Sequence, residues 1–128
     1  MTKIKTDVAD TWFSKFIRLR DGKCMRCGSP MKFNDRGDPI SHQASHFKGR
    51  REEATRFDPE NVDTLCYGCH QYFHENEDKH EIWAIELKGQ RLVDEITIRS
   101  GSYKKKDRKL EALIWKQVYK DLKNEMSR

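Results

Sequence analysis

Four cysteines arranged as two C-x2-C pairs constrain this chain more than any other feature of its sequence. The pairs are Cys24 with Cys27 and Cys66 with Cys69, and 38 residues separate them. A C-x2-C hairpin points two thiolates at one ion, and four thiolates form the closed tetrahedral site that is typical of structural zinc. The separation exceeds the common zinc-ribbon spacing, so we expect an inserted structural element between the two pairs.

The alternative is that the cysteines form two disulfides or remain unrelated free thiols. Only 35% of the 128 residues are hydrophobic and 37% are charged, so a single domain over residues 1–128 needs a covalent or metal cross-link, and the cysteines are the candidates for it. The N-terminus has no apolar signal-peptide core, and no segment approaches the length of a membrane span. We therefore expect a cytoplasmic protein with no membrane partner, whose reduced cysteines bind Zn²⁺.

The pattern of apolar residues predicts a mixed α+β chain. Helical spacing predicts an N-terminal helix over residues 7–20 and a basic amphipathic C-terminal helix over residues 104–128. Between them we place a cysteine-bounded core at residues 24–88, with short strands at 40–47 and 62–65. A helical pattern follows from residue 69 to 87, broken near Glu77, whereas residues 90–103 give no assignable pattern.

A second set of polar side chains lies in the insert and just after it. His70 and His74 are four residues apart, so both imidazoles project from one face of a helix. Such a pair is often merely solvated, and the spacing alone does not establish a metal site. The order along the chain adds weight, because His46 on a strand, Asn61 in the following loop and His70 on a helix are the three elements of an HNH nuclease site.

The chain resembles zinc-stabilised HNH, or ββα-metal, nucleases, whose core is a β-hairpin followed by a helix around one divalent ion. The segments WFSKFIRLRD, QASHF at 43–47 and RFDPEN at 56–61 are similar to the lambdoid-phage NinG (Rap) recombination endonucleases. The likeness runs from about residue 7 to residue 75, and the basic C-terminal helix also fits that family. The resemblance implies a phage-encoded endonuclease in the host cytoplasm that cuts branched DNA, such as Holliday junctions and D-loops.

The resemblance also implies roles for individual residues. His46 is the general base that takes a proton from water, since a near-neutral imidazole suits that step. Asn61 bonds the backbone of its loop and so fixes the strand that carries His46. His70, followed by His74, binds a catalytic Mg²⁺ or Mn²⁺. The oligomeric state stays open, although a homodimer would suit a resolvase, since a four-way junction needs two cuts.

One position departs from the HNH pattern. Many HNH enzymes carry an Asp or His directly before the general base, but this chain has Ser45, and a neutral hydroxyl is a poor ligand for a hard cation. Either the metal is held weakly until the scissile phosphate adds oxygen ligands, or His42, Asp63 or Glu75 contributes. With imidazole ligands, Mn²⁺ or Ni²⁺ should bind more tightly than Mg²⁺ in vitro.

The charge distribution indicates an anionic partner, which we expect to be DNA. The net charge is +5, and residues 99–128 hold ten basic and four acidic residues. We expect phosphate contacts from two basic groups, Arg50 with Arg51 and Lys104 with Lys105 and Lys106. For the lysine run, a solvated helix start is an equally good interpretation.

Two other function classes stay open from the sequence. A zinc-knuckle DNA-binding module without catalysis would carry the same cysteines and basic residues, and would leave His46 and Asn61 as ordinary strand and loop residues. A structural adaptor would instead bind another protein through its C-terminal helix. Metal-dependent DNA cleavage separates the nuclease from both.

Overall fold

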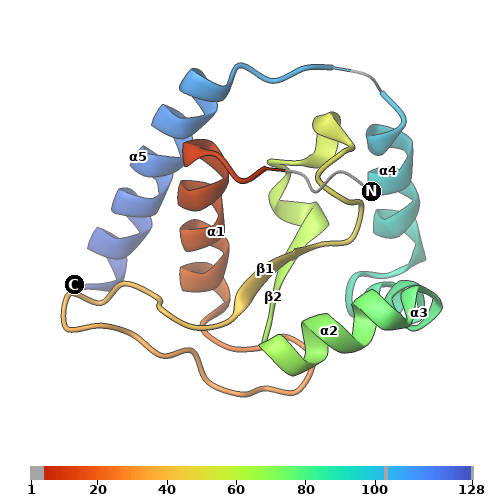
Figure 1. Ribbon diagram of the computed structural model, residues 1–128, viewed down its shortest axis with the longest axis horizontal. Helices are drawn as coiled ribbons and strands as arrows, with labels where there is room; N and C mark the ends of the chain where they lie inside the picture. The colour runs from red at the N-terminus through yellow and green to blue at the C-terminus, as the bar shows by residue number, and fades with distance from the viewer. Residues whose placement is uncertain (1–4, 103, 128) are drawn as a thin grey trace.

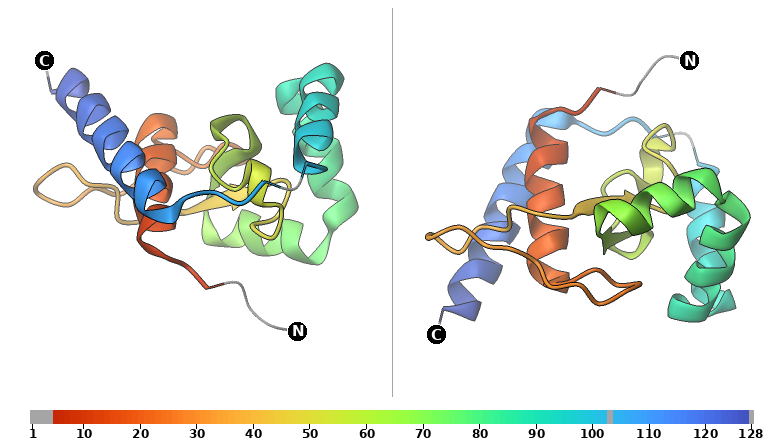
Figure 2. Two further views of the ribbon diagram at one scale, coloured as in Figure 1. Left: turned by 90° about the horizontal axis from the view of Figure 1, so that it is seen from above. Right: turned by 60° about the horizontal axis from the view of Figure 1, so that its bottom comes forward.

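The computed structural model describes residues 5–102 and 104–127, and within them the fold is α+β, as predicted. Its elements are α1 (Val8–Asp21), β1 (Gln43–His46), the short 3-10 helices η1 (Glu53–Thr55) and η2 (Pro59–Asn61), β2 (Val62–Leu65), α2 (Tyr67–Glu75), α3 (Glu77–Lys88), α4 (Gln90–Ser100) and α5 (Arg108–Met126). The two strands lie in the middle of the molecule, with α1 and α5 on one side and α2, α3 and α4 on the other (Figure 1). Figure 2 shows the same separation from two other directions.

Helix α1 is defined by strong signals at both ends. Asp7 and Asp10 form a capping box, in which each carboxylate accepts from the other residue's backbone N–H at 3.0 and 2.9 Å. The helix stops at Gly22, whose φ of 67° is left-handed and favours glycine. The buried face of α1 packs against α5, where the Phe13 and Trp115 ring centroids are 4.7 Å apart. This helix covers the range that the sequence predicts, within one residue at each end.

The central sheet is a single antiparallel pair of strands. Its partners are Gln43 with Leu65, Ala44 with Thr64, Ser45 with Asp63, and His46 with Val62. Strand β2 has the predicted bounds and is buried throughout. Strand β1 is shorter than the predicted 40–47, because His42 has a φ of 65°, which is outside the extended conformation that a strand needs.

The helical segment after the second cysteine pair is two helices rather than one. Asn76, with φ −136° and ψ 70°, separates α2 from α3, close to the predicted break. The unassigned segment that follows forms α4, which buries Val93, Ile96 and Ser100. Ile98 is exposed on the same helix, so its apolar residues do not lie on one face and the sequence did not reveal the helix.

The C-terminal helix starts later than the predicted residue 104. Asp107 caps α5 by accepting hydrogen bonds from the backbone N–H groups of Lys109 and Leu110, both at 3.1 Å. The cap makes Arg108 the first helical residue, so the run of lysines at 104–106 precedes the helix instead of forming its first turn. Arg128, the end of the predicted helix, lies outside the described residues.

Two hydrophobic clusters hold the sheet between the helices. One contains Ala9, Phe13, Ile17, Phe57, Val62 and Trp115, and the other contains Cys24, Leu65, Cys69 and Phe73. Because β2 contributes Val62 to the first cluster and Leu65 to the second, this strand connects α1 to the cysteine region. Within the described residues, no helix combines the length and the apolar character needed to cross a membrane.

Candidate functional site

The structure brings the four cysteines together, as the spacing predicts. Their Sγ atoms all lie within 4.8 Å of one another, and those of Cys27 and Cys66 are 3.7 Å apart. A tetrahedral zinc site with bonds of about 2.3 Å has sulfur–sulfur edges of about 3.8 Å, so the cluster has the right size for one ion. All four cysteines are free in the structure, as a shared metal site requires.

Backbone N–H groups shape both cysteine pairs in the same way. The Cys27 N–H points to the Cys24 sulfur at 3.5 Å, and the Cys69 N–H points to the Cys66 sulfur at 3.4 Å. Gly28 follows the first pair with a φ of 80°, a left-handed turn that a side chain would strain. Hydrogen bonding to Ser29 lowers the pKa of the Cys27 thiol to about 6, which favours the thiolate that a metal needs.

Arg26 covers one side of the cysteine cluster and was not singled out from the sequence. Its Nη1 donates to the Cys69 sulfur at 3.5 Å. Its guanidinium carbon stands 4.3 Å from the centroid of the Tyr72 ring and 5.0 Å from that of Phe73. A site with four thiolates and one Zn²⁺ has a net charge of −2, so a cation held against one sulfur stabilises it.

His46, at the end of β1, has the properties of a neutral proton acceptor. Its Nε2 lies 2.9 Å from the Arg56 carbonyl oxygen, which can only accept, so Nε2 carries the proton and Nδ1 keeps its lone pair. Burial lowers the pKa of His46 to about 4, so the imidazole is neutral near pH 7 but is a weaker base than the near-neutral imidazole expected from the sequence.

Asn61 bonds the backbone of its loop, in the manner expected from the sequence. Its Nδ2 donates to the carbonyl oxygens of Lys48 and Thr55 at 2.9 and 3.0 Å, and its Oδ1 accepts from the Lys48 N–H at 2.8 Å. The Asn61 side chain is fully buried. It therefore closes the loop from residue 47 to residue 61, and this loop also contains the Arg56 carbonyl that orients His46.

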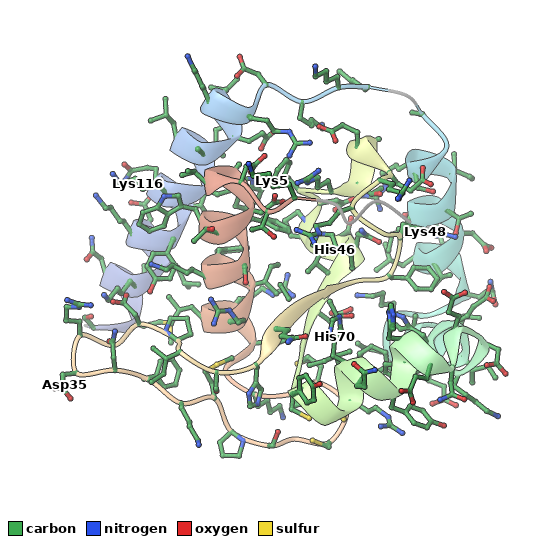
Figure 3. All side chains as sticks on the ribbon, viewed as in Figure 1. Lys5, Asp35, His46, Lys48, His70 and Lys116 are labelled. Atoms are coloured by element: carbon green, nitrogen blue, oxygen red, sulfur yellow. The ribbon has the colours of Figure 1, made fainter. Side chains whose placement is uncertain are left out.

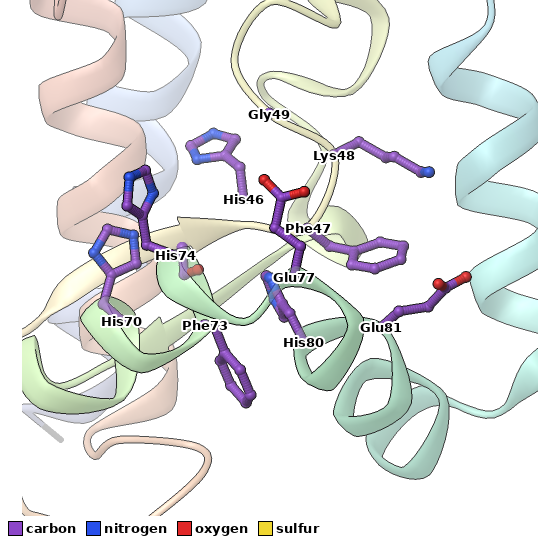
Figure 4. Close-up of a pocket in the computed structure, with 11 residues that line it drawn as sticks. His46, Phe47, Lys48, Gly49, His70, Phe73, His74, Glu77, His80 and Glu81 are labelled. Atoms are coloured by element: carbon purple, nitrogen blue, oxygen red, sulfur yellow. The ribbon is translucent and has the colours of Figure 1, made fainter.

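The histidines of the hairpin and of α2 line the same hollow in the surface. Two cavities of about 420 and 710 Å³ share four lining residues, which are His46, Gly49, His70 and His74. Figure 3 shows His46 and His70 facing the centre of the molecule from β1 and α2, and Figure 4 shows His74 beside them. His46, His70 and His74, which the sequence places in one site, therefore line the same cavities.

The histidine pair on α2 offers two donors for a metal. Burial, together with the neighbouring His74, lowers the pKa of His70, so its ring is neutral and has a lone pair to donate. Among the described residues, however, only the four cysteines form a group of three or more ligand atoms within 4.8 Å of one another. The imidazole donor set suits a divalent transition metal, and a third protein ligand is not already in place.

The three residues offered as substitutes for the missing acid are engaged in other bonds. His42 lines the larger cavity, but its Nε2 lies 2.9 Å from the Ser29 carbonyl oxygen. Asp63 pairs with Lys88 at 2.6 Å, and Glu75 accepts from Gln71 at 3.1 Å without lining either cavity. The acids that do line the smaller cavity are Glu77 and Glu81, which the sequence analysis missed.

The predicted phosphate-binding residues lie in two different places. Arg50 lines the larger cavity and donates to the Thr6 hydroxyl at 2.7 Å, and Arg51 is exposed on the same loop. The lysines at 104–106 lie on the segment directly before α5, at the edge of the molecule opposite α2 (Figure 1). The first two are exposed, and the backbone N–H of Lys106 donates to Glu53 at 3.2 Å.

The chain matches no model of a known protein family, no curated protein and no solved structure. The likeness to phage recombination endonucleases therefore stays a prediction. Its coarser part, an α+β fold with a four-cysteine cluster suited to zinc, is present in the structure.

Proposed function

We propose that this protein is an HNH-type endonuclease that hydrolyses DNA with a divalent metal and carries a structural zinc on its four cysteines. One observation carries the proposal: His46, His70 and His74 line one cavity. They come from an antiparallel pair of strands and the helix that follows it. A binding module or an adaptor has no need of a neutral, oriented imidazole facing a second pair of imidazoles. The buried Asn61 that closes the intervening loop adds support.

The roles of the residues follow from their bonds. His46 accepts a proton at Nδ1 from the water that attacks phosphorus, while its Nε2–H stays on the Arg56 carbonyl. His70 and His74 would hold the catalytic Mg²⁺ or Mn²⁺, which when bound there would stabilise negative charge on the phosphate and on the departing 3′ oxygen. The products would carry 5′ phosphate and 3′ hydroxyl ends.

The proposed substrate is branched DNA, a step that rests on the resemblance to recombination endonucleases and not on the cavity. Arg50 at the larger cavity is placed to contact a phosphate next to the scissile one. A second copy of the chain would supply the second cut that a four-way junction requires. Both points are tested by the choice of substrate and by measuring the mass of the protein in solution.

The deciding experiment compares a synthetic four-way junction with a matched linear duplex, with and without Mg²⁺ or Mn²⁺. His46→Gln is the variant of choice, because a glutamine amide still donates to the Arg56 carbonyl but cannot act as a base. We expect cleavage to fall by about 10²- to 10⁴-fold, the usual contribution of a general base, while DNA binding persists. Full cleavage by this variant would overturn the role of His46.

The matched control is His42→Asn: His42 also lines the larger cavity, but its Nε2 is held at the Ser29 carbonyl, and asparagine tolerates its left-handed backbone. This variant should cleave like the wild type. A wild-type protein that binds the junction but cuts it with neither metal would instead support the zinc-knuckle DNA-binding module.

A further inference from the structure

The cavity around the histidines contains acidic side chains that the HNH pattern does not account for. Glu77 and Glu81 line the smaller cavity, and Asp10 lines the larger one. Asp10 is buried against Arg56, whose Nε donates to it at 2.9 Å, so its charge is already neutralised. The two glutamates are exposed at the cavity and are the acids within reach of a metal there.

Glu77 is the better placed of the two glutamates. It is the first residue of α3, and its side chain extends toward the region of His46 and His74, whereas Glu81 lies one turn further along α3 and away from them (Figure 4). The carboxylate of Glu77 thus approaches the histidine group from the side opposite His70.

The break between α2 and α3 explains how an acid comes to this position. The Asn76 side chain donates to the Tyr72 carbonyl at 2.8 Å and ends α2, and α3 then starts in a new direction. Glu75, on the other side of the break, bonds to Gln71 and lines neither cavity. Two neighbouring glutamates therefore face different environments, which makes Glu75 a natural control for Glu77.

We propose that Glu77 supplies the anionic ligand that Ser45 cannot, so that His70, His74 and Glu77 together hold the catalytic divalent cation. This proposal rests on the proposed function and names the third ligand of the same site. Two neutral imidazoles leave the full +2 charge of the ion uncompensated, whereas an added carboxylate halves it and provides the oxygen that Mn²⁺ and Mg²⁺ prefer.

The ligand set closes when the Glu77 side chain turns toward the histidines. The three donors do not lie within 4.8 Å of one another in this structure. Glu77 is exposed and has three rotatable side-chain bonds, so its carboxylate can move without disturbing a packed core. His70 and His74 lie four residues apart on α2, so their imidazoles already project from one face of that helix.

The test measures Mn²⁺ binding to the full-length, zinc-loaded protein in the absence of DNA, from the loss of the electron paramagnetic resonance signal of free Mn²⁺. Glu77→Gln keeps the shape of the side chain and removes its charge, and we expect it to weaken Mn²⁺ binding by about tenfold or more, the scale seen when metal-site residues are changed. Glu75→Gln and Glu81→Gln should bind Mn²⁺ as the wild type does. In cleavage assays, Glu77→Gln should lose activity at low Mn²⁺ and recover it at high Mn²⁺.

The outcomes separate this proposal from the proposed function. If His70→Ala loses Mn²⁺ binding but Glu77→Gln does not, Glu77 is not a ligand and the nuclease proposal stands. A loss with Glu81→Gln instead of Glu77→Gln also overturns the assignment. If Glu77→Gln weakens Mn²⁺ binding in a protein that cuts no DNA, the ligand assignment stands and the nuclease proposal fails. Absence of Mn²⁺ binding by the wild type overturns the ligand assignment.

Discussion

Replacing Asn61 by alanine should destabilise the protein by about 3 kcal/mol, because the change removes three hydrogen bonds of about 1 kcal/mol each. The bonds join the Asn61 amide to Lys48 N, Lys48 O and Thr55 O, at 2.8, 2.9 and 3.0 Å. The bond to Thr55 is buried, so its carbonyl would lose its partner without gaining water. The Lys48 N–H and carbonyl are only partly buried, so water can replace the lost amide. The expected loss of stability therefore stays at about 1 kcal/mol for each bond.

The assay is urea unfolding of the zinc-loaded protein, followed by circular dichroism and by tryptophan fluorescence. Asn76→Ala is the matched control, since that side chain makes one exposed bond, to the Tyr72 carbonyl, and should cost less than about 1 kcal/mol. Asn61→Asp keeps the acceptor for Lys48 N–H and loses both donors, so it should be destabilised at least as much as the alanine variant.

The reasoning fails if Asn61→Ala and Asn76→Ala differ by less than about 0.5 kcal/mol, since the loop would then not depend on the buried amide. A folded Asn61→Ala protein has a second use. The same loop presents the Arg56 carbonyl to His46, so cleavage should fall further than the fraction of unfolded protein explains.

Three further predictions concern the metal, pH and salt. Native mass spectrometry should find one zinc, and a strong chelator should unfold the protein; a folded, metal-free form with a disulfide between Cys24 and Cys27 would contradict the zinc site. Burial lowers the pKa of both His46 and His80 to about 4, so unfolding takes up protons between pH 6.5 and pH 4. Stability should therefore fall as the pH drops through that window, by up to about 1.4 kcal/mol per pH unit for His46 and by less for the partly exposed His80, whose charge solvent screens. His80→Phe keeps the stack on Phe73 and should reduce this slope in a series of urea melts at different pH; an unchanged slope would argue against a half-buried, neutral His80. Changing Lys104, Lys105 and Lys106 to glutamine should reduce the slope of log affinity against log salt by about 3 if all three meet phosphates, and an unchanged slope would exclude that role.

The sequence predicted those parts of the site that depend on the spacing of residues close together in the chain. A C-x2-C pair fixes two thiolates on one turn, so the four cysteines were found without knowledge of the intervening fold. The helical spacing of His70 and His74 and the order of His46 before them likewise anticipated the shared cavity. Each of these signals depends on residues within one turn, or on strand and helix order, which local sequence determines.

The parts that the sequence missed depend on contacts between distant segments. Asp63 looked available as a ligand, but Lys88, which lies 25 residues further along the chain, pairs with it at 2.6 Å. Burial raises the pKa of Asp63, which further reduces its value as an anionic ligand. No local sequence pattern indicates an ion pair between residues so far apart in the chain.

Glu77 is a different case, because a partial signal was present. On one continuous helix it would fall on the face of His70, seven residues or about two turns earlier, whereas Glu75 would fall well away from it. The helix breaks at Asn76, so this projection does not describe the position that Glu77 takes. Glu77 lines the cavity because α3 starts in a new direction, which the sequence does not reveal.

The cysteine cluster and the histidine cavity are connected through α2 and the two strands. Cys66 caps α2 and Cys69 lies in its first turn, directly before His70. The first cysteine pair is tied to the sheet, because the Met25 N–H donates to the Thr64 carbonyl at 2.9 Å on β2. A metal that joins the two pairs therefore fixes α2 against the hairpin and sets the position of His70 relative to His46. Such a metal would contact neither histidine, yet it would determine whether the strand and the helix present their imidazoles to the same cavity.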